Sequence, residues 1–255
     1  MNHDGLFAID FHVHTSRSFD CLTPPRLVVE IARRRGLDGI AIVDHDTIEG
    51  AKIAMSVNDD PNFLIIPGVE VKSDRGDIIG LYLREDIVSR KFPDVIAEIH
   101  AQGGIAYLPH PVRTFGAENL ARLHADHPDI DLWELYNGRY GTREFAQAKQ
   151  TFDSMGIRGT LCGSDAHFPW EIGVFRTMLA GMPRDPKALM ELSTRAVLRA
   201  NVRSKFALRA GIRLGEVTKT AKRRQYGKLA RLVASVPWKL VKASVSFALR
   251  SNRMK

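Results

Sequence analysis

Residues 6–36 read LFAIDFHVHTSRSFDCLTPPRLVVEIARRRG, and this stretch decides the fold class. Its first part is an apolar run that ends in polar HVH, which predicts a strand emerging from a buried core. From residue 23 the apolar side chains are spaced as in a helix, with Thr23 as a candidate N-cap, Pro24 in the first turn and Gly36 at the end. A strand followed directly by an amphipathic helix is one βα unit.

The same alternation continues along the chain. Strand-like runs are expected at residues 39–44, 63–71, 77–83, 105–109, 129–136, 157–163 and 172–180, and helices at 47–57, 92–104 and 141–156. This pattern predicts an α/β fold with a parallel sheet and crossover helices. About seven such units favour closure into a barrel over an open sheet.

The composition is that of a chain that can bury a full core. It has 255 residues, of which 44% are hydrophobic, so one main domain is expected. No run approaches the ~18 apolar residues of a membrane span, and the N-terminal residues lack a secretory signal, so we expect a cytoplasmic protein. Cys21 and Cys162 are too few for a disulfide framework, and we expect both to be reduced and buried.

The charge is divided unevenly along the chain. Residues 1–194 contain 20 Lys and Arg against 28 Asp and Glu, whereas residues 195–255 contain 17 Lys and Arg against Glu216 alone. The basic part also has apolar residues at helical spacing, namely Leu229, Leu232, Val233, Val236, Leu240, Ala243 and Phe247. We therefore predict a main domain over residues 1–195 and a basic helical C-terminal extension over residues 196–255. Such an extension can lie on an anionic membrane surface, bind nucleic acid or pack on the acidic main domain.

Unusual polar residues stand where the predicted strands end. The motifs are HVHT at 12–15, DHDT at 44–47, PGVE at 67–70, LPHP at 108–111 and GSDAH at 163–167. In a parallel barrel the carboxyl ends of all strands meet at one rim, so we expect these side chains to converge. Imidazoles and carboxylates without cysteine suit Zn, Mn or Fe, and the share of carboxylates is compatible with more than one divalent ion. Each motif alone could be structural, but five of them at successive strand ends predict a metal site.

In this order, the five motifs resemble those of the PHP family, named for its polymerase and histidinol phosphatase members. The resemblance is closer to the small stand-alone phosphoesterases of that family than to the domain embedded in DNA polymerases. It implies a distorted (β/α)7 TIM-like barrel with two or three divalent metal ions (Mn, Fe or Zn) that hydrolyses phosphate esters. It does not account for the basic extension.

The resemblance also implies a set of metal ligands. The first ion takes His12, His14, Glu70 and Asp165, the second shares Glu70 and takes His110, and the third takes Asp20, His45 and His167. Many relatives have a histidine at the position of Asp20, and a carboxylate there favours Mn or Fe. Relatives with three full sites offer a further histidine to the second ion, where this chain has Asn137 with Glu134 nearby. We therefore expect the second site to be loose, or to be completed by substrate phosphate.

The chemistry expected of such a site needs no protein nucleophile. Two divalent ions roughly 3.5–4 Å apart can lower the pKa of a shared water towards ~7 and bind the phosphoryl oxygens. His167, His45 and Asp46 are candidates to protonate the leaving alkoxide. Asp10, on the same strand face as His12, is a candidate to orient a ligand.

Three arginines near the motifs are candidates for binding substrate phosphate. Arg113 follows the LPHP motif, Arg139 follows Asn137, and Arg17 follows HVHT. A guanidinium group can bind a phosphate through two hydrogen bonds. Each of the three could equally be a solvated loop arginine.

The leading functional hypothesis is hydrolysis of a phosphomonoester of a small metabolite, such as a nucleotide, a sugar phosphate or an amino-alcohol phosphate. One alternative is a 3′-5′ nuclease in which the basic extension holds the strand, and another is a catalytically silent binding module. Binding of a strand through many phosphates weakens steeply as salt rises, so salt dependence separates the first two.

Overall fold

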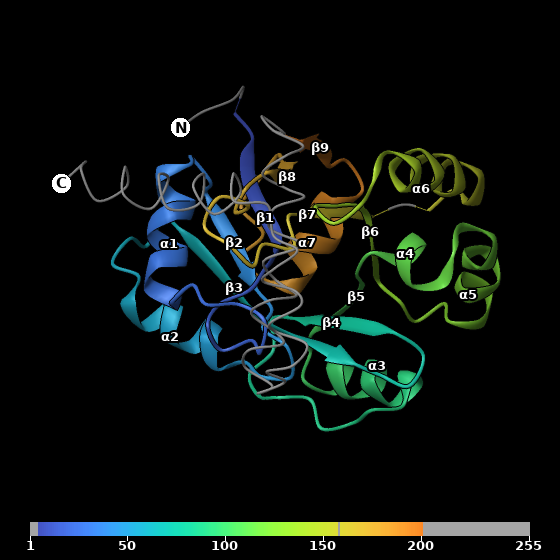
Figure 1. Cartoon of the computed structure of the whole chain (residues 1–255), viewed down its shortest axis with the longest axis horizontal. Coiled ribbons are helices and arrows are strands. Elements are labelled where there is room, and N and C mark those ends of the chain that lie inside the picture. The colour runs from blue at the N-terminus through green and yellow to red at the C-terminus, as the bar shows by residue number, and fades with distance from the viewer. Residues whose placement is uncertain (1–4, 158, 201–255) are drawn as a thin grey trace, which may run out of the picture.

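The strands form one sheet in the order β7-β6-β5-β4-β3-β2-β1-β8-β9, in the part of the chain that the computed structural model describes, residues 5–157 and 159–200 (Figure 1). The strands are β1 (Phe7–Val13), β2 (Gly39–Ile42), β3 (Leu64–Lys72), β4 (Asp77–Leu81), β5 (Ile105–Leu108), β6 (Leu132–Asn137), β7 (Thr160–Gly163), β8 (Phe175–Leu179) and β9 (Val197–Ala200). The helices are α1 (Pro25–Arg34), α2 (Glu49–Val57), α3 (Phe92–Ala101), α4 (Pro111–Phe115), the 3₁₀ helix η1 (Ala117–Asn119), α5 (Leu120–Asp126), α6 (Thr142–Met155) and α7 (Pro186–Ser193).

The sheet closes on itself where β1 meets the chain that follows β7. The His14 N–H donates to the carbonyl of Ala166 (3.0 Å), and the Ala166 N–H donates to the carbonyl of His12 (3.3 Å). The fold is therefore a nearly closed, TIM-like barrel, which confirms the predicted fold class. Closure also brings residues 12–14 directly beside residues 165–167.

The expectation of an all-parallel sheet is wrong for two of the predicted strands, β4 and β8. β1, β2 and β3 are parallel to one another, as are β5, β6 and β7, but β4 pairs antiparallel with both β3 and β5. Residues 73–76 are too few for a crossover, which needs a dozen or more residues, so β3 and β4 can only form a hairpin. β8 is likewise antiparallel to β1 and to β9.

Helices cover the outside of the barrel, with α1 and α2 packed side by side along β2 and β3, α3 on β4 and β5, and α4 and α6 on β6 (Figure 1). One apolar cluster joins helices to the sheet and includes Val28, Ile40 and Ala51. A second is built almost entirely from strand side chains, such as Ile66 and Leu161, which places it inside the barrel. Because successive side chains along a strand point to opposite faces of the sheet, most of the strands contribute residues to both clusters.

Several boundaries differ from those predicted. The N-cap of α1 is Pro24, with Pro25 in the first turn, so Thr23 is not the cap; Gly36 ends the helix in the left-handed region (φ 71°), as expected. The sequence did not indicate α4, α7 or β9. Because β9 pairs with β8, the sheet runs to residue 200, beyond the predicted boundary at 195.

The remainder of the predicted basic extension, residues 201–255, lies outside the described residues. Among the described residues, no helix combines the length and the apolar character that crossing a membrane requires. Cys21 and Cys162 are both buried and are not joined in a disulfide, as predicted.

Candidate metal centre

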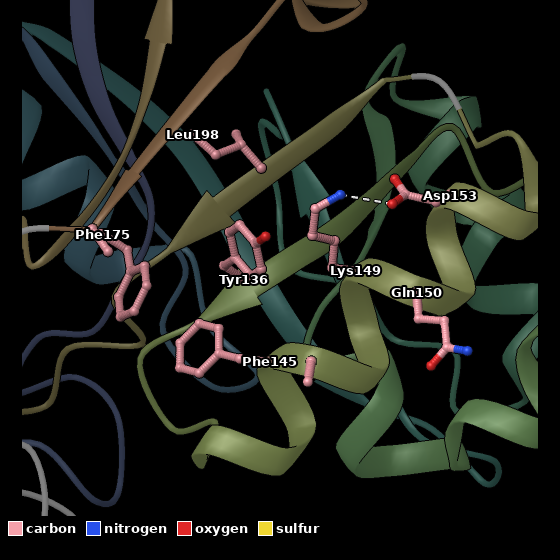
Figure 2. A pocket seen from close by; sticks show the side chains of 9 residues that line it. Tyr136, Phe145, Lys149, Gln150, Asp153, Phe175 and Leu198 are labelled. Atoms are coloured by element: carbon pink, nitrogen blue, oxygen red, sulfur yellow. Dashed lines mark hydrogen bonds and ion pairs between the residues drawn. The ribbon is translucent and has the colours of Figure 1, made fainter.

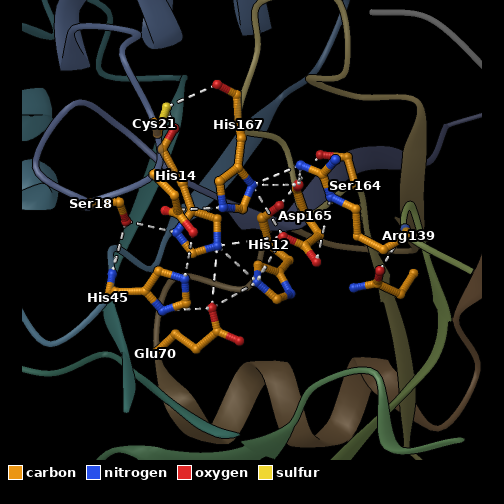
Figure 3. A network of polar contacts seen from close by, with 12 residues as sticks. His12, His14, Ser18, Cys21, His45, Glu70, Arg139, Ser164, Asp165 and His167 are labelled. Carbon is orange, nitrogen blue, oxygen red and sulfur yellow. Dashed lines mark hydrogen bonds and ion pairs between the residues drawn. The ribbon is translucent and has the colours of Figure 1, made fainter. Parts of the chain in front are cut away.

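The polar residues at the strand ends gather in one cluster at one end of the barrel (Figure 3). Its members are His12 on β1, His14 directly after β1, His45 after β2, Glu70 on β3, His110 after β5, and Asp165 and His167 after β7. Three overlapping groups drawn from these side chains and Asp77 have ligand atoms close enough to hold a metal ion. Residues separated by up to 155 positions, His12 and His167, therefore share one site.

Three ligand atoms, from His12, His14 and Glu70, lie close enough together to share one ion, and an Asp165 oxygen borders two of them. The Nε2 atoms of His12 and His14 lie 3.1 Å apart, and Glu70 Oε2 lies 3.4 Å and 3.3 Å from them. Asp165 Oδ1 lies 3.8 Å from His12 Nε2 and 3.6 Å from His14 Nε2. A tetrahedral ion with bonds of about 2.0–2.2 Å separates its ligand atoms by about 3.3–3.6 Å. His12, His14 and Glu70 come near this spacing, and Asp165, predicted for the same ion, lies beside the two histidines.

Glu70 presents its other oxygen to a second group. Its Oε1 atom lies 3.1 Å from His110 Nε2, and the carboxylate of Asp77 completes a potential ligand group with these two residues. Asn137, the predicted weak ligand, is engaged at both ends of its amide: it donates to Glu134 Oε2 (2.8 Å) and accepts from the Arg139 N–H (2.7 Å). The structure thus offers Asp77 for the second group and uses Asn137 to support the loop.

The third predicted group is held together by Asp20. Its Oδ2 atom lies 3.4 Å from His45 Nε2, and its Oδ1 atom lies 3.2 Å from His167 Nε2. Oδ1 is buried and accepts no hydrogen bond with good geometry from the described residues. A buried carboxylate oxygen without a donor is costly, and a cation bound between the two imidazoles would satisfy it. The potential ligand group formed here is His14, His45 and His167, with Asp20 beside the last two.

Buried polar side chains contact the candidate ligands and their loops on the side away from the ligand cluster. Glu134 Oε1 lies 3.3 Å from His12 Nδ1, while Glu134 Oε2 accepts from the His110 N–H (2.7 Å). This is the carboxylate–histidine–metal arrangement that orients a ligand and fixes its tautomer. Asp10 accepts from Ser164 N (2.9 Å), from Ser164 Oγ (2.6 Å) and, more distantly, from His12 N (3.3 Å). Asp10 therefore ties β1 to the loop after β7, in line with its expected supporting role.

The pKa shifts in the cluster show that its buried carboxylates need positive charge beside them. Burial lowers the pKa of His45, but Glu70 and Asp20 outweigh burial and raise that pKa to about 9. In the same way, Asp165 and Glu70 overcome the burial of His12 and raise its pKa well above the usual value. Burial raises the pKa of Glu70, yet His12 and His45 hold it well below its ordinary range. Without a metal, protons on imidazoles neutralise these carboxylates.

Arg139 does not have the freedom that phosphate binding requires. Its NH1 and NH2 atoms donate to the two oxygens of Glu171, both at 3.2 Å, and its side chain is only 7% exposed. NH2 also contacts the carbonyl of Asp165 and His167 Nδ1, both at 2.8 Å. The predicted phosphate-binding role is therefore replaced by a structural one, in which Arg139 holds the GSDAH loop. No motif in the sequence marked Glu171 as its partner.

The other predicted polar residues lie at the surface. Asp46 is 44% exposed in its side chain and pairs with Arg90 (3.4 Å), so it is separate from the ligand cluster. Arg17 pairs with Glu49 (3.4 Å) and its side chain is also 44% exposed. Arg113 is exposed on α4, three residues after the ligand His110, and has no ion-pair partner among the described residues. Of the three arginines, Arg113 has the most freedom to meet a substrate.

A separate hollow of about 730 Å³ lies between α6 and the strands β6, β8 and β9 (Figure 2). Tyr136, Phe145 and Phe175 give it an apolar surface, and an ion pair between Lys149 and Asp153 (2.6 Å) borders it. None of the described residues that line it belongs to the predicted site. The hollow is therefore distinct from the metal centre.

Comparison with known proteins agrees with this picture. Residues 143–194 match the family model described as PHP-associated. The chain is 34% identical over 113 residues to the uncharacterized protein MJ1587 of Methanocaldococcus jannaschii, a match that covers 40% of this chain and 66% of that relative. The chain thus spans just under two thirds of the length of this relative.

Solved structures share the fold. A two-domain protein of Bacteroides vulgatus containing a predicted PHP-like metal-dependent phosphoesterase superimposes with a TM-score of 0.62 at 20% identity, over 78% of this chain and 67% of that one. An amidohydrolase from Chromobacterium violaceum with bound sulfate gives a TM-score of 0.57 at 18% identity, over 77% and 99% of the two chains. The chain is thus similar to a PHP-associated family model over residues 143–194, and it shares its fold with a protein that contains a predicted PHP-like metal-dependent phosphoesterase.

Proposed function

We propose that this protein is a metal-dependent phosphoric ester hydrolase that releases phosphate from a phosphomonoester of a small metabolite. The observation that carries the proposal is that ligand atoms of His12, His14 and Glu70 gather at the spacing of a single ion, with an Asp165 oxygen beside both histidines. The second oxygen of Glu70 faces His110, which allows one carboxylate to serve two ions. Such bridged sites are typical of enzymes that hydrolyse phosphate esters.

Divalent ions such as Mn, Fe or Zn, when bound, would lower the pKa of a water molecule and neutralise the phosphoryl oxygens. The chain's own residues would orient the substrate and handle its protons. His45 and His167 flank Asp20, with 16% and 9% of their side chains exposed, so both reach the open side of the cluster. They are our candidates to protonate the leaving alkoxide, and Arg113 is our candidate to bind a phosphate oxygen.

Metal content and phosphate release, measured on the same preparations, test the proposal. We expect the parent protein loaded with Mn, Fe or Zn to bind at least two ions and to release phosphate from one or more members of a panel of nucleotides, sugar phosphates and amino-alcohol phosphates. Asp165→Ala removes a ligand of the first group and His45→Ala one of the third, so each should lose bound metal. Activity should fall by more than the about 10–100-fold typical of losing a supporting residue.

His100→Ala is a matched control. His100 is bonded to Asp131 (2.7 Å) at the end of α3 and belongs to none of the three ligand groups, so its loss should leave metal content unchanged. A parent protein that binds no transition metal, or ligand variants that keep full metal and rate, would refute the proposal.

A 3′-5′ nuclease is the second candidate, because the same ligand geometry suits a phosphodiester and the chain has a strongly basic C-terminal part. Turnover of a small monoester should change little between low and moderate salt. Strand cleavage through many phosphate contacts should collapse over the same range. Cleavage of an oligonucleotide without monoester turnover would favour the nuclease, and inactivity on both classes after full metal loading would favour a silent binding module.

A further inference from the structure

The two ring nitrogens of His14 face different surroundings. Nε2 points into the ligand cluster, 3.3 Å from Glu70 Oε2 and 3.1 Å from His12 Nε2. Nδ1 points away from it and lies 2.9 Å from Ser18 Oγ (Figure 3). A histidine can bind a metal through Nε2 only if that atom keeps its lone pair, which requires the proton to be on Nδ1. The residue that meets Nδ1 therefore decides whether His14 is ready to bind.

The polar groups around the Ser18 hydroxyl favour one arrangement for its proton. A serine hydroxyl can donate once and accept twice. The His45 N–H, which can only donate, gives its hydrogen to Ser18 Oγ at 2.9 Å. The Asp44 carboxylate, which can only accept when ionised, accepts from the Ser18 N–H (3.2 Å) and so lies beside the Ser18 side chain. With the hydroxyl proton directed to this carboxylate, the oxygen offers a lone pair to His14 Nδ1.

Asp44 is itself fixed for this task. It accepts from Thr15 N (2.6 Å), Thr15 Oγ1 (2.7 Å) and Ser18 N (3.2 Å), and it is fully buried. Gly50, in the first turn of α2, leaves the room that the carboxylate occupies, because a Cβ there would lie 1.8 Å from Asp44 Oδ2. Neither Ser18 nor Asp44 contacts Nε2 of His14. Ser18 instead contacts the other ring nitrogen, Nδ1, and Asp44 accepts a hydrogen bond from Ser18.

We propose that Ser18, with its hydroxyl oriented by Asp44, is a positioning residue that keeps a proton on His14 Nδ1 and so leaves Nε2 open to metal. The proposal rests on the proposed function in one respect, that a metal binds at His14 Nε2. Glu134 does the same for His12 directly, with its carboxylate 3.3 Å from His12 Nδ1. At His14 the carboxylate of Asp44 acts indirectly, through the Ser18 hydroxyl, which can either donate or accept a hydrogen bond.

The hydroxyl makes the proposal testable by substitution. Ser18→Ala removes the acceptor, and Asp44→Asn replaces the acceptor of the hydroxyl proton by a group that can donate. Both should weaken binding of Mn or Zn by about 10–100-fold, the usual loss for a partner of a metal ligand. Ser18→Thr keeps the hydroxyl and should restore affinity to near the parent value. Ser56→Ala, which removes an exposed hydroxyl bonded to Ile53 on α2, is the matched control and should change nothing.

Two readouts besides activity separate the possible outcomes. Metal affinity is measured by competition with a chelator on variants whose fold is checked by circular dichroism. Long-range proton–nitrogen NMR of the metal-free, ¹⁵N-labelled protein reports which nitrogen of His14 carries the proton. We expect protonated Nδ1 in the parent and in Ser18→Thr, and a shift towards protonated Nε2 in Asp44→Asn.

A parent protein with the proton on Nε2 of His14 alone, or Ser18→Ala and Asp44→Asn variants with unchanged metal affinity, would overturn the proposal. If Ser18→Ala does not fold, Asp44→Asn and the NMR measurement on the parent still decide. A parent that binds no metal but carries the proton on Nδ1 would count against the proposed function while leaving the tautomer assignment intact.

Discussion

Replacing Arg139 by methionine separates two roles for this arginine. A guanidinium that binds substrate phosphate is expendable for folding, whereas one that neutralises a buried carboxylate is not. In the structure the side chains of Arg139 and Glu171 are 7% and 1% exposed, and two hydrogen bonds of 3.2 Å join them. Methionine keeps most of the volume of the arginine stem but leaves Glu171 charged, buried and without its partner.

The cost should be large on the scale of a single domain. Removal of one member of a buried ion pair typically lowers the free energy of unfolding by about 3–5 kcal/mol. Domains of this kind are stable by only about 5–15 kcal/mol, so Arg139→Met should lose a substantial share of the total. It should also loosen the loop that presents Asp165 and His167, because Arg139 contacts both. Metal affinity should therefore fall together with stability.

Urea unfolding followed by circular dichroism measures the effect. Arg139→Met should shift the midpoint strongly downwards, and adding Glu171→Met to it should recover part of the loss, because no unpaired charge then remains. Arg113→Met is the control: this arginine is exposed, so its loss should leave unfolding unchanged and raise KM for a phosphate ester. The reasoning fails if Arg139→Met unfolds at the parent midpoint and changes only KM.

Three further predictions concern the metal and the thiols. Glu70→Gln should reduce metal content more than any other single ligand substitution when measured by elemental analysis, because its two oxygens face two ligand groups. Metal uptake at pH 7 should release protons, because His12 and His45, the latter with a pKa of about 9, are protonated in the metal-free protein. The apparent affinity for metal should therefore rise with pH up to about 9. Calorimetry in buffers of different ionisation enthalpy should show the proton release. Burial raises the pKa of Cys21 to about 12 and that of Cys162 higher still, so a thiol reagent at pH 8 should label neither cysteine until denaturant is added; rapid labelling of the native protein would contradict their burial.

The succession of strands and helices could be predicted from local pattern, but strand direction could not be predicted by the same rule. The run at 77–83 contains β4, yet a prediction of one more parallel strand ignores how short the connection to β3 is. A loop of four residues at 73–76 rules out a crossover, so the information was present in the spacing. β8 was harder, since the eleven residues at 164–174 before it carry motif residues and form no helix.

The site was predictable where ligands stand at strand ends and less so elsewhere. His12, Glu70 and Asp165 meet because a barrel gathers strand ends, a rule that needs only sequence order. Asp77 comes from the start of β4, which the hairpin turns back along β3 towards Glu70, so it became visible only with the direction of that strand. Glu171 lies in a loop, and the geometry of loops is set by tertiary contacts rather than local pattern.

The hydrogen bonds between β1 and the segment after β7 also bear on how the protein acquires its metal. Because the first ligand group joins residues 12 and 14 to residue 165, a chain whose barrel has not yet closed lacks a complete set of ligands. Closing that loop of some 150 residues is an entropic cost that falls late in folding. An ion that binds only the closed form draws the equilibrium towards it, so the supply of metal would govern how long each molecule stays intact. When the ion is scarce, the amount of folded protein should therefore fall before its catalytic rate changes.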